Sequence, residues 1–182
     1  MDIGIAAHTD RPDKGGFFSK LKGEGSLVPA MAPFNSVALA WVGGCLAIAG
    51  VAGLADLTDF PLILGSFGAT CVLVFGYPEL PFSQPRNVIV GHLISSLIGL
   101  VVLQVCGPHW WAVGLATGTA IAAMMLTRTV HPPAGSNPVI VFLAHPSWGF
   151  LLMPTLAGAI LVTLFAIIYN NMARSIKYPK YW

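Results

Sequence analysis

The hydrophobic residues of this chain fall into six apolar stretches, which polar, glycine- or proline-containing segments separate. A helix needs about 20 apolar residues to span the hydrocarbon of a bilayer, with a lower limit near 17. Four stretches are long enough, but the second and fifth are not: as pure helix, the fifth would cover only about 18 Å. The pattern predicts four full spans and two short half-helices or re-entrant segments. The stretches are 34–55, 61–76, 88–106, 110–126, 133–144 and 148–170.

The two short stretches are copies of one motif. The octapeptide 68–75 recurs 67 positions later as 135–142, with Gly, two Val and Phe identical and close substitutions between them. At the same offset Gly91 matches Gly158, so the repeat extends into the following stretch. Duplicated, interrupted segments in a membrane protein usually hold a polar solute, because irregular backbone in the bilayer survives only where it lines a cavity.

Positive charge favours six crossings. Basic residues flank both ends of the apolar region and place both termini in the cytoplasm. With six crossings the loops that carry Arg86 and Arg128 also face the cytoplasm, whereas four crossings would turn both outward. Each repeat then has three segments, so the halves 34–106 and 110–171 are inverted relative to each other. We therefore expect an all-α integral protein of the inner (plasma) membrane with cytoplasmic tails 1–32 and 173–182 around a transmembrane domain, 33–172. The flanking basic residues are Arg11, Lys14, Lys20, Lys22, Arg174, Lys177 and Lys180.

Composition supports a membrane protein and excludes other classes. Hydrophobic residues make up 55% of the chain and charged residues 9%, whereas soluble domains carry about 25% charged residues. The net charge of +2 is too small to indicate nucleic-acid binding. No Ser-His-Asp grouping, paired carboxylates or phosphate loop indicates an enzyme. The five histidines lack ligand spacing, so neither a metal site nor a cofactor is predicted.

The chemistry of the short segments favours an anion. Asn137 followed by Pro138 is a typical helix start with Asn as the N-cap, and Thr70 is expected to cap the other short helix at the corresponding place. Two helix N-termini that meet halfway through the bilayer would present partial positive charge to a shared cavity. The segments contain no Asp, Glu or Lys, which leaves neutral donors for a weakly hydrated monovalent anion. The expected site residues are Ser66, Gly68, Thr70, Gly135, Ser136 and Asn137.

Basic and titratable residues near these segments extend the hypothesis. Arg86 and Arg128 could recruit an anion to the pore mouth, although interface anchoring and orientation is the favoured explanation for each one alone, and both roles can hold together. His131 and His92 could couple transport to protons, and the alternative for His131 is a hydrogen bond that holds its loop. The turns themselves could also be packing kinks without a ligand.

Three motifs resemble the HPP family of small integral membrane proteins. They are 131–138 (His-Pro-Pro-Ala-Gly-Ser-Asn-Pro), 66–70 (Ser-Phe-Gly-Ala-Thr) and 84–92 (Gln-Pro-Arg-Asn-Val-Ile-Val-Gly-His), in that family's order. The resemblance covers most of residues 34–170. Members in plants and cyanobacteria act as nitrite transporters, so it implies nitrite as the anion. The family is usually described with four spanning helices, which differs from the six segments expected here.

The function expected from these observations is a membrane transporter or channel for a small monovalent anion, nitrite first. Two alternatives stay open: a non-transporting membrane sensor or assembly subunit, and a channel for a small neutral solute. A chain of 182 residues has little protein with which to enclose a pathway, so we also expect a homodimer. Its other partners are the lipid bilayer and the anion itself.

Overall fold

The computed structural model describes residues 17–21 and 27–182. The chain divides into two units at the boundary between Ala32 and Pro33, and each is described by itself. In the first unit a single helical turn, α1 (Phe17–Lys20), is exposed to solvent. Arg11, Lys14 and Lys22, which contribute to the predicted orientation, lie outside the described residues.

The second unit is built from helices, and no strand occurs among its residues. Three helical stretches are long and apolar enough to cross a membrane: α2 (Phe34–Thr58), α4 (Pro85–Cys106) and the stretch Trp148–Ala173. The last joins the turns η4 (Trp148–Leu151) and η5 (Leu152–Leu156) to α7 (Ala157–Ala173). The helix α5 (Trp110–Leu126) has 17 residues, near the lower limit for a span.

The two remaining apolar segments are short, as their lengths predict, but both begin later than expected. The first comprises α3 (Ser66–Cys71) and the π-helical turn η1 (Val72–Gly76), because residues 61–65 lack helical structure. The second, α6 (Asn137–Ala144), has eight residues and follows the 3-10 turn η3 (Pro132–Ser136). Consecutive prolines at 132 and 133 prevent an earlier α-helical start, since each lacks an N–H and restricts the residue before it.

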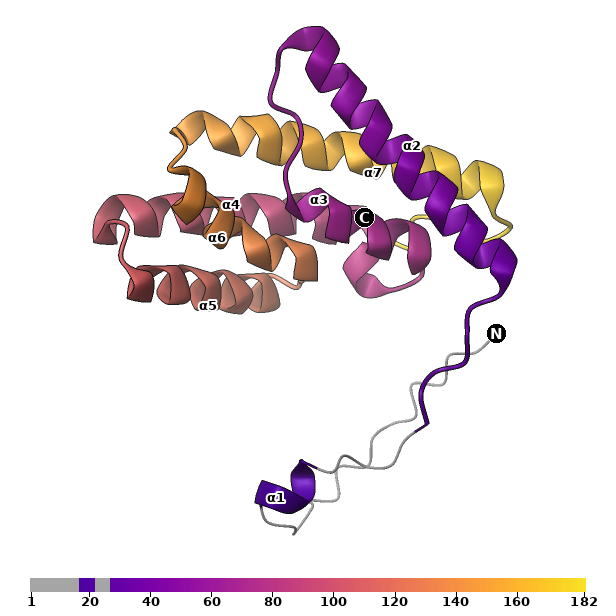
Figure 1. The fold of residues 1–182 in the computed structure, drawn as a ribbon, viewed down its shortest axis with the longest axis horizontal. Helices are drawn as coiled ribbons and strands as arrows, with labels where there is room; N and C mark the ends of the chain where they lie inside the picture. Colours follow the sequence, from indigo (N-terminus) through magenta and orange to yellow (C-terminus); the bar gives the residue numbers. More distant parts are fainter. Residues whose placement is uncertain (1–16, 22–26) are drawn as a thin grey trace. The chain divides into compact units, whose positions relative to one another are not determined.

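The apolar segments of the second unit run in alternating directions along one axis (Figure 1). The helices α3 and α6 both begin near the middle of that axis, where the chain descends from the end of α2 and returns from the end of α5. From this shared level they run toward opposite ends. The arrangement places the starts of both short helices deep within the unit.

Small residues on α4 let the neighbouring segments approach it closely. A Cβ atom at Gly91 would lie 2.9 Å from His131 Cβ and 3.0 Å from the Thr129 carbonyl oxygen. A Cβ atom at Gly99 would lie 3.0 Å from Pro138 Cα, on α6. Gly91 and Gly99 on α4 therefore allow close packing of the loop and helix that carry the second motif copy.

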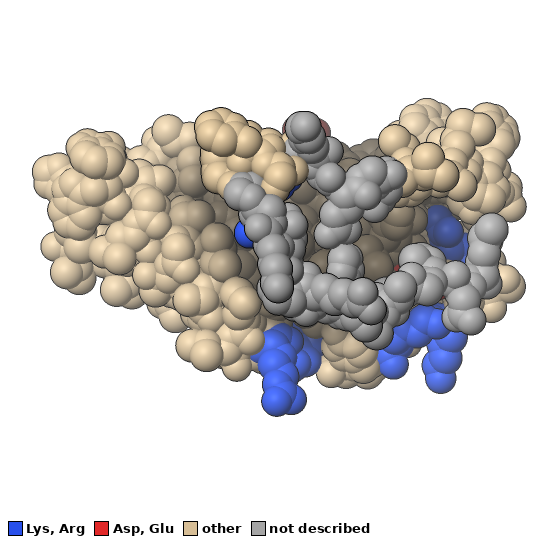
Figure 2. All heavy atoms as spheres, turned by 90° about the horizontal axis from the view of Figure 1, so that it is seen from below, with Lys and Arg blue, Asp and Glu red and all other residues tan. Residues whose placement is uncertain are grey.

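Two glycines on α5, in contrast, do not face a neighbouring segment. A Cβ atom at Gly114 or Gly118 would meet nothing within 4 Å, so this side of α5 is open. Helices elsewhere also expose large apolar side chains, among them Trp41 on α2, which is 70% exposed. Residues other than Lys, Arg, Asp and Glu make up most of the visible surface in Figure 2. Such a surface is stable in lipid, and the open side of α5 leaves the homodimer as a prediction.

The crossing of α7 over the start of α3 generates a stability prediction. A Cβ atom at Gly158 would overlap with the Leu62 carbonyl oxygen and the Phe67 ring. Because backbone cannot yield as a flexible side chain can, Gly158→Ala should lower the free energy of unfolding by about 1–3 kcal/mol. Thermal unfolding in detergent micelles measures the effect. Gly118→Ala is the matched control and should unfold at or above the wild-type midpoint, since Ala favours helix. Equal midpoints for the two variants would contradict this packing.

Candidate functional site

The two short helices meet through their first side chains. Ser66 Oγ donates a hydrogen bond to Asn137 Oδ1 at 2.8 Å, although 71 positions separate the two residues. Both are buried, with 4% and 0% of their surfaces exposed. The contact joins the start of α3 to the start of α6 and so links the two copies of the motif.

The amide of Asn137 also connects these starts to α4. Its Nδ2 donates to Ser96 Oγ at 2.9 Å and to His92 Nδ1 at 3.1 Å, and lies 3.3 Å from the His92 carbonyl oxygen. The residues His92 and Ser96 are one helical turn apart on the same face of α4. One buried side chain therefore holds three helices.

Thr70 lies between two histidines. Its Oγ1 is 3.0 Å from His92 Nε2 and 2.9 Å from His131 Nε2, and all three residues have 0% exposure. On its other side His131 contacts the Phe82 carbonyl oxygen through Nδ1, at 2.7 Å. His131 therefore connects α3 with the loop that leads into α4.

These contacts fix the hydrogen positions of the neutral rings. A carbonyl oxygen only accepts, so His131 carries its hydrogen on Nδ1 and accepts from the Thr70 hydroxyl at Nε2. Thr70 has then used its only hydrogen and accepts from His92 Nε2–H. His92 Nδ1 is left as the acceptor for the Asn137 amide. The assignment follows from the hydrogen-bond network. The Ser66 carbonyl oxygen, 3.2 Å from Thr70 Oγ1, competes for the same hydrogen over a longer distance than His131 Nε2.

Two further hydroxyls complete what we call the buried polar cluster. Ser96 Oγ lies 3.1 Å from Thr155 Oγ1, at the start of the α7 stretch. Each side chain is 4% exposed or less. No member is Asp, Glu, Lys or Arg, so hydrogen bonds rather than ion pairs satisfy the cluster. Its members are Ser66, Thr70, His92, Ser96, His131, Asn137 and Thr155.

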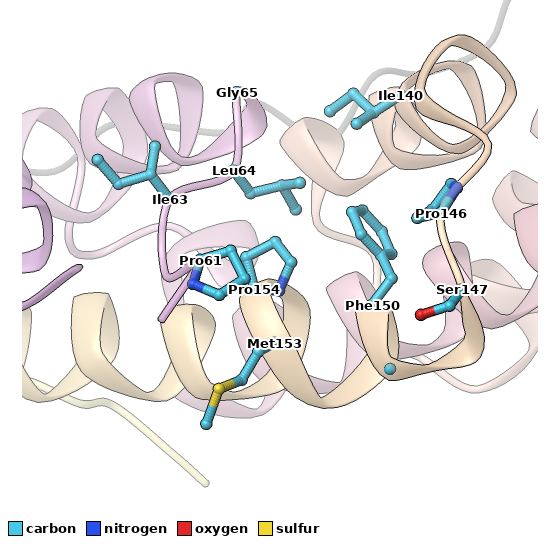
Figure 3. Close-up of a pocket in the computed structure, with 11 residues that line it drawn as sticks. Pro61, Ile63, Leu64, Gly65, Ile140, Pro146, Ser147, Phe150, Met153 and Pro154 are labelled. Atoms are coloured by element: carbon cyan, nitrogen blue, oxygen red, sulfur yellow. The ribbon is translucent and has the colours of Figure 1, made fainter. Parts of the chain in front are cut away.

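A cavity of about 590 Å³ adjoins the cluster on one side, and we call it the vestibule. Gly65 and Pro154, which line it, directly precede the cluster residues Ser66 and Thr155. In Figure 3, Leu64, Ile140 and Phe150 point toward one another across this space. Its lining is mostly apolar, and the cluster side chains are not among the residues that line it.

Arg86 lies on the opposite side of the cluster and binds backbone. Its Nη1 donates to the Arg128 carbonyl oxygen and its Nη2 to that of Thr127, both at 3.1 Å. These carbonyls follow the end of α5, where Arg128 adopts a left-handed conformation with φ of +56°. The hydrogen bonds from the amides of Arg128 and Thr129 to the Met125 and Met124 carbonyls form a Schellman ending.

The C-terminal residues pack onto the same side. Tyr178 is 2% exposed and donates its hydroxyl to the Ser83 carbonyl oxygen at 2.6 Å. Burial raises the pKa of Tyr178, so the hydroxyl keeps its hydrogen through the neutral range. The Lys180 amide donates to Gln84 Oε1 at 2.7 Å. The last residues therefore brace the loop whose Phe82 carbonyl holds His131.

Comparison with known proteins identifies the family. The profile of the HPP transmembrane region matches residues 29–179. The chain belongs to the HPP family. This HPP protein is similar to two transmembrane proteins of Dictyostelium discoideum. One is 34% identical over 178 residues, which cover 91% of this chain and 57% of the relative; the other is 36% identical over 129 residues, which cover 66% and 45%. The HPP chain thus spans about half the length of these curated relatives. No solved structure matches it.

The structure brings together five of the residues predicted from the HPP sequence and separates the others from them. Gly68 is exposed on α3 and lines a surface groove against α2. Gly135 is half-buried, and Ser136 is exposed, with its Oγ bonded to the Pro133 carbonyl oxygen at 2.8 Å. The five in the cluster are Ser66, Thr70, His92, His131 and Asn137.

The capping roles predicted for two of these residues are wrong. Ser136 and Gly65 occupy the N-cap positions of α6 and α3, and neither helix has a side-chain cap. Asn137 is the first residue of α6 and directs its amide across to other helices. Thr70 lies one turn into α3, with its hydroxyl 3.2 Å from the Ser66 carbonyl oxygen. Asn137 therefore binds neighbouring helices, and Thr70 contacts both its own helix and the two histidines.

Sequence reasoning missed two members of the cluster in this HPP protein. Ser96 follows His92 by four positions, so the helical period could have placed both on one face. Thr155 had no comparable signal, because it lies in the irregular stretch before α7. The predicted Arg86 and Arg128 do lie side by side, but the contact runs from the Arg86 side chain to the Arg128 backbone.

The Arg86 contact predicts that charge alone does not replace the guanidinium. Lys cannot donate to two carbonyls in the same planar geometry, so Arg86→Lys should lower the free energy of unfolding by about 1 kcal/mol. The thermal unfolding midpoint in micelles measures this. Arg128→Lys is the matched control and should change stability by less than about 0.5 kcal/mol, since only its backbone takes part. If both variants unfold together, the contact does not stabilise the fold.

Proposed function

We propose that this HPP protein transports a small monovalent anion across a membrane, with nitrite as the first candidate, and that it acts as a transporter rather than an enzyme. One observation carries the proposal. Two short helices begin at a single cluster of uncharged hydrogen-bonding groups, deep among helices long enough to span a bilayer. Interrupted helices of this kind hold polar solutes in transport proteins.

The chemistry of the cluster supports an anion over a cation. A cation site would normally use acidic oxygens, and no Asp or Glu belongs to the cluster. Hydroxyl, amide and imidazole groups can turn hydrogens toward an anion, and α6 begins at Asn137 with its free N–H groups. These neutral donors suit a weakly hydrated monovalent ion better than phosphate or sulfate, whose desolvation is more costly.

The alternating directions of the segments support two inverted repeats. The first repeat would comprise α2, α3 with η1, and α4; the second α5, α6 and α7. Each has a short helix between two longer ones, and the two short helices run in opposite directions from the cluster (Figure 1). Inverted repeats allow the vestibule to open on one side while the other side closes, which is the basis of alternating access.

The distribution of basic residues supports an orientation. Arg174 donates to the Phe75 carbonyl oxygen, and Tyr181 contacts Asn87 beside Arg86, so the C-terminal residues and both internal arginines share one end. We propose that this end is cytoplasmic and that the protein lies in the plasma membrane. The vestibule then opens outward, and the arginines attract anions at the inner mouth.

A second candidate is a channel for a small neutral solute. The observation that favours it is the same absence of formal charge from the cluster, since an uncharged site also suits water, ammonia or nitrous acid. Membrane voltage separates a neutral channel from an anion that crosses without a proton. Net anion conduction changes with voltage, whereas neutral flux does not.

The proposal predicts that Asn137→Leu abolishes anion flux. Purified protein in liposomes should take up nitrite, and should carry sulfate and phosphate at least tenfold more slowly. The leucine removes every hydrogen bond of the amide that joins α3, α4 and α6. Asn35→Leu, the same change at an exposed position, is the control and should keep wild-type flux.

A second measurement applies if Asn137→Leu does not fold. Nitrite that binds the folded wild-type protein should raise its thermal unfolding midpoint, by an amount equivalent to about 2.7 kcal/mol at 100 times the dissociation constant. Sulfate at equal ionic strength should not. Wild-type protein that neither carries nor binds small anions would remove the proposed function.

A further inference from the structure

The buried polar cluster forms a continuous line of contacts that ends at the loop containing Phe82. Thr155 stands beside vestibule residue Pro154 and contacts Ser96, whose hydroxyl binds the Asn137 amide. The line continues through His92, Thr70 and His131 and ends at the Phe82 carbonyl oxygen. The Phe82 side chain is 39% exposed, so this end lies near the surface of the unit.

From Asn137 to the Phe82 carbonyl the hydrogens of this line all point the same way, whereas Asn137 also donates to Ser96 on its other side. Asn137 donates to His92, His92 to Thr70, Thr70 to His131, and His131 to the Phe82 carbonyl. The middle three groups each accept on one side and donate on the other, which is what a chain needs to pass a proton by successive short transfers. The carbonyl of Phe82 sets the direction, because it requires hydrogen on His131 Nδ1.

We propose that His92, Thr70 and His131 form a proton relay that couples anion transport to one proton. The inference rests on the proposed function and adds its energy source: the anion and a proton cross together from the vestibule side, so that the substrate is carried as the equivalent of a weak acid. Thr70 is the obligatory middle group, since its oxygen lies within 3.0 Å of a nitrogen of each ring.

During the proton transfer, each group that loses a hydrogen gains another one. A proton from the vestibule side binds His92 Nδ1 when the Asn137 amide moves away. The N–H bond at His92 Nε2 breaks as Thr70 Oγ1 gains that hydrogen, and the Thr70 hydroxyl hydrogen forms a bond to His131 Nε2. His131 then releases the hydrogen on Nδ1 to the opposite side. One proton has entered and one has left, and no charge stays behind.

The hydrogen positions after the transfer explain why only one proton crosses in each cycle. His131 Nδ1 now presents a lone pair to the Phe82 carbonyl oxygen, and two acceptors 2.7 Å apart are unfavourable. The line cannot pass a second proton until the hydrogens return to their first positions, which requires the contacts to separate. Movement of Asn137 away from Ser66 and His92 is also what would admit an anion between the short helices. One opening therefore passes one anion and one proton.

The His92 and His131 rings are neighbours, and the helices around them carry few charged side chains. Their centroids are 5.0 Å apart, and the helices α5, α6 and α7 contain no charged residue. The cysteine next to Thr70, Cys71, is buried on α3. The charged side chains of the elements that border the cluster are exposed at the Phe82 end of the molecule. They are Arg86 at the start of α4, Arg128 after α5 and Glu79 before η2 (Pro81–Ser83).

Thr70→Val tests the relay, because valine keeps the size of threonine and removes the hydroxyl. Wild-type protein in liposomes that contain a pH-sensitive dye should acidify the lumen as nitrite enters, at an alkaline pH where nearly all nitrite is ionised. Protein-free vesicles give the background. Thr70→Val should reduce acidification at least tenfold, and any nitrite uptake that remains should become sensitive to an imposed membrane potential. Thr70→Ser keeps the hydroxyl and should acidify at close to the wild-type rate.

Two further measurements keep the test decisive if Thr70→Val does not fold. His131→Asn can still donate to the Phe82 carbonyl but cannot pass a proton through its side chain, so it should also lose acidification. Nitrogen NMR of histidine-labelled wild-type protein should find hydrogen on Nδ1 of His131 and on Nε2 of His92. The opposite pair of tautomers would overturn the relay whatever the flux.

The outcomes separate this inference from the function on which it rests. Nitrite uptake without acidification in the wild type, or undiminished acidification in Thr70→Val, would overturn the relay and leave anion transport standing. Absence of nitrite uptake in the wild type would remove both.

Discussion

The structure depends on the hydrogen bonds of a single buried amide. Asn137 accepts from Ser66 and donates to Ser96 and His92, so it ties the start of each short helix to the central helix α4. Neither short helix could span a bilayer or stay in lipid with its first turn unpaired. In an apolar surrounding the loss of one partner leaves the others unsatisfied, which makes the group of contacts cooperative. This junction positions the starts of α3 and α6 against α4.

The same contacts that stabilise the fold are those that a transported solute would have to replace. A polar cluster that is fully satisfied internally is closed, and an anion gains a place in it only by substituting for one of its own hydrogen bonds. The exchange has a small free-energy cost because neutral donors such as amides and hydroxyls can turn toward a new acceptor. Under the proposed function, such a site would be both buried and receptive, and the absence of a fixed charge would keep it from holding an ion permanently.

Much of this architecture could be predicted from the sequence, because the relevant signals are long or duplicated. The repeat of 68–75 as 135–142 predicted two short helices. In the structure the starts of these two helices do meet, through Ser66 and Asn137. The lengths of the remaining stretches identified the long helices. Membership of the HPP family, expected from three motifs, is confirmed.

What could not be predicted is how side chains at these positions are directed. Asn137 reads as a cap in sequence, but the 3-10 turn before it shifts the helix start by one residue and turns the amide toward α4. Thr155 became a member only because the irregular start of the α7 stretch rotates it inward. Ser136 and Gly68 belong to the right motifs but face the wrong side. Such outcomes depend on helix rotation and on pairings between segments far apart in sequence, which a linear pattern does not contain.

The packing of residues 178–181 has a consequence far from where they lie. Tyr178, Lys180 and Tyr181 bind the loop and helix start at 81–87, and Asn171 holds the Tyr178 backbone in place. A change that displaces these residues would therefore move a loop whose carbonyl orients a histidine in the middle of the protein.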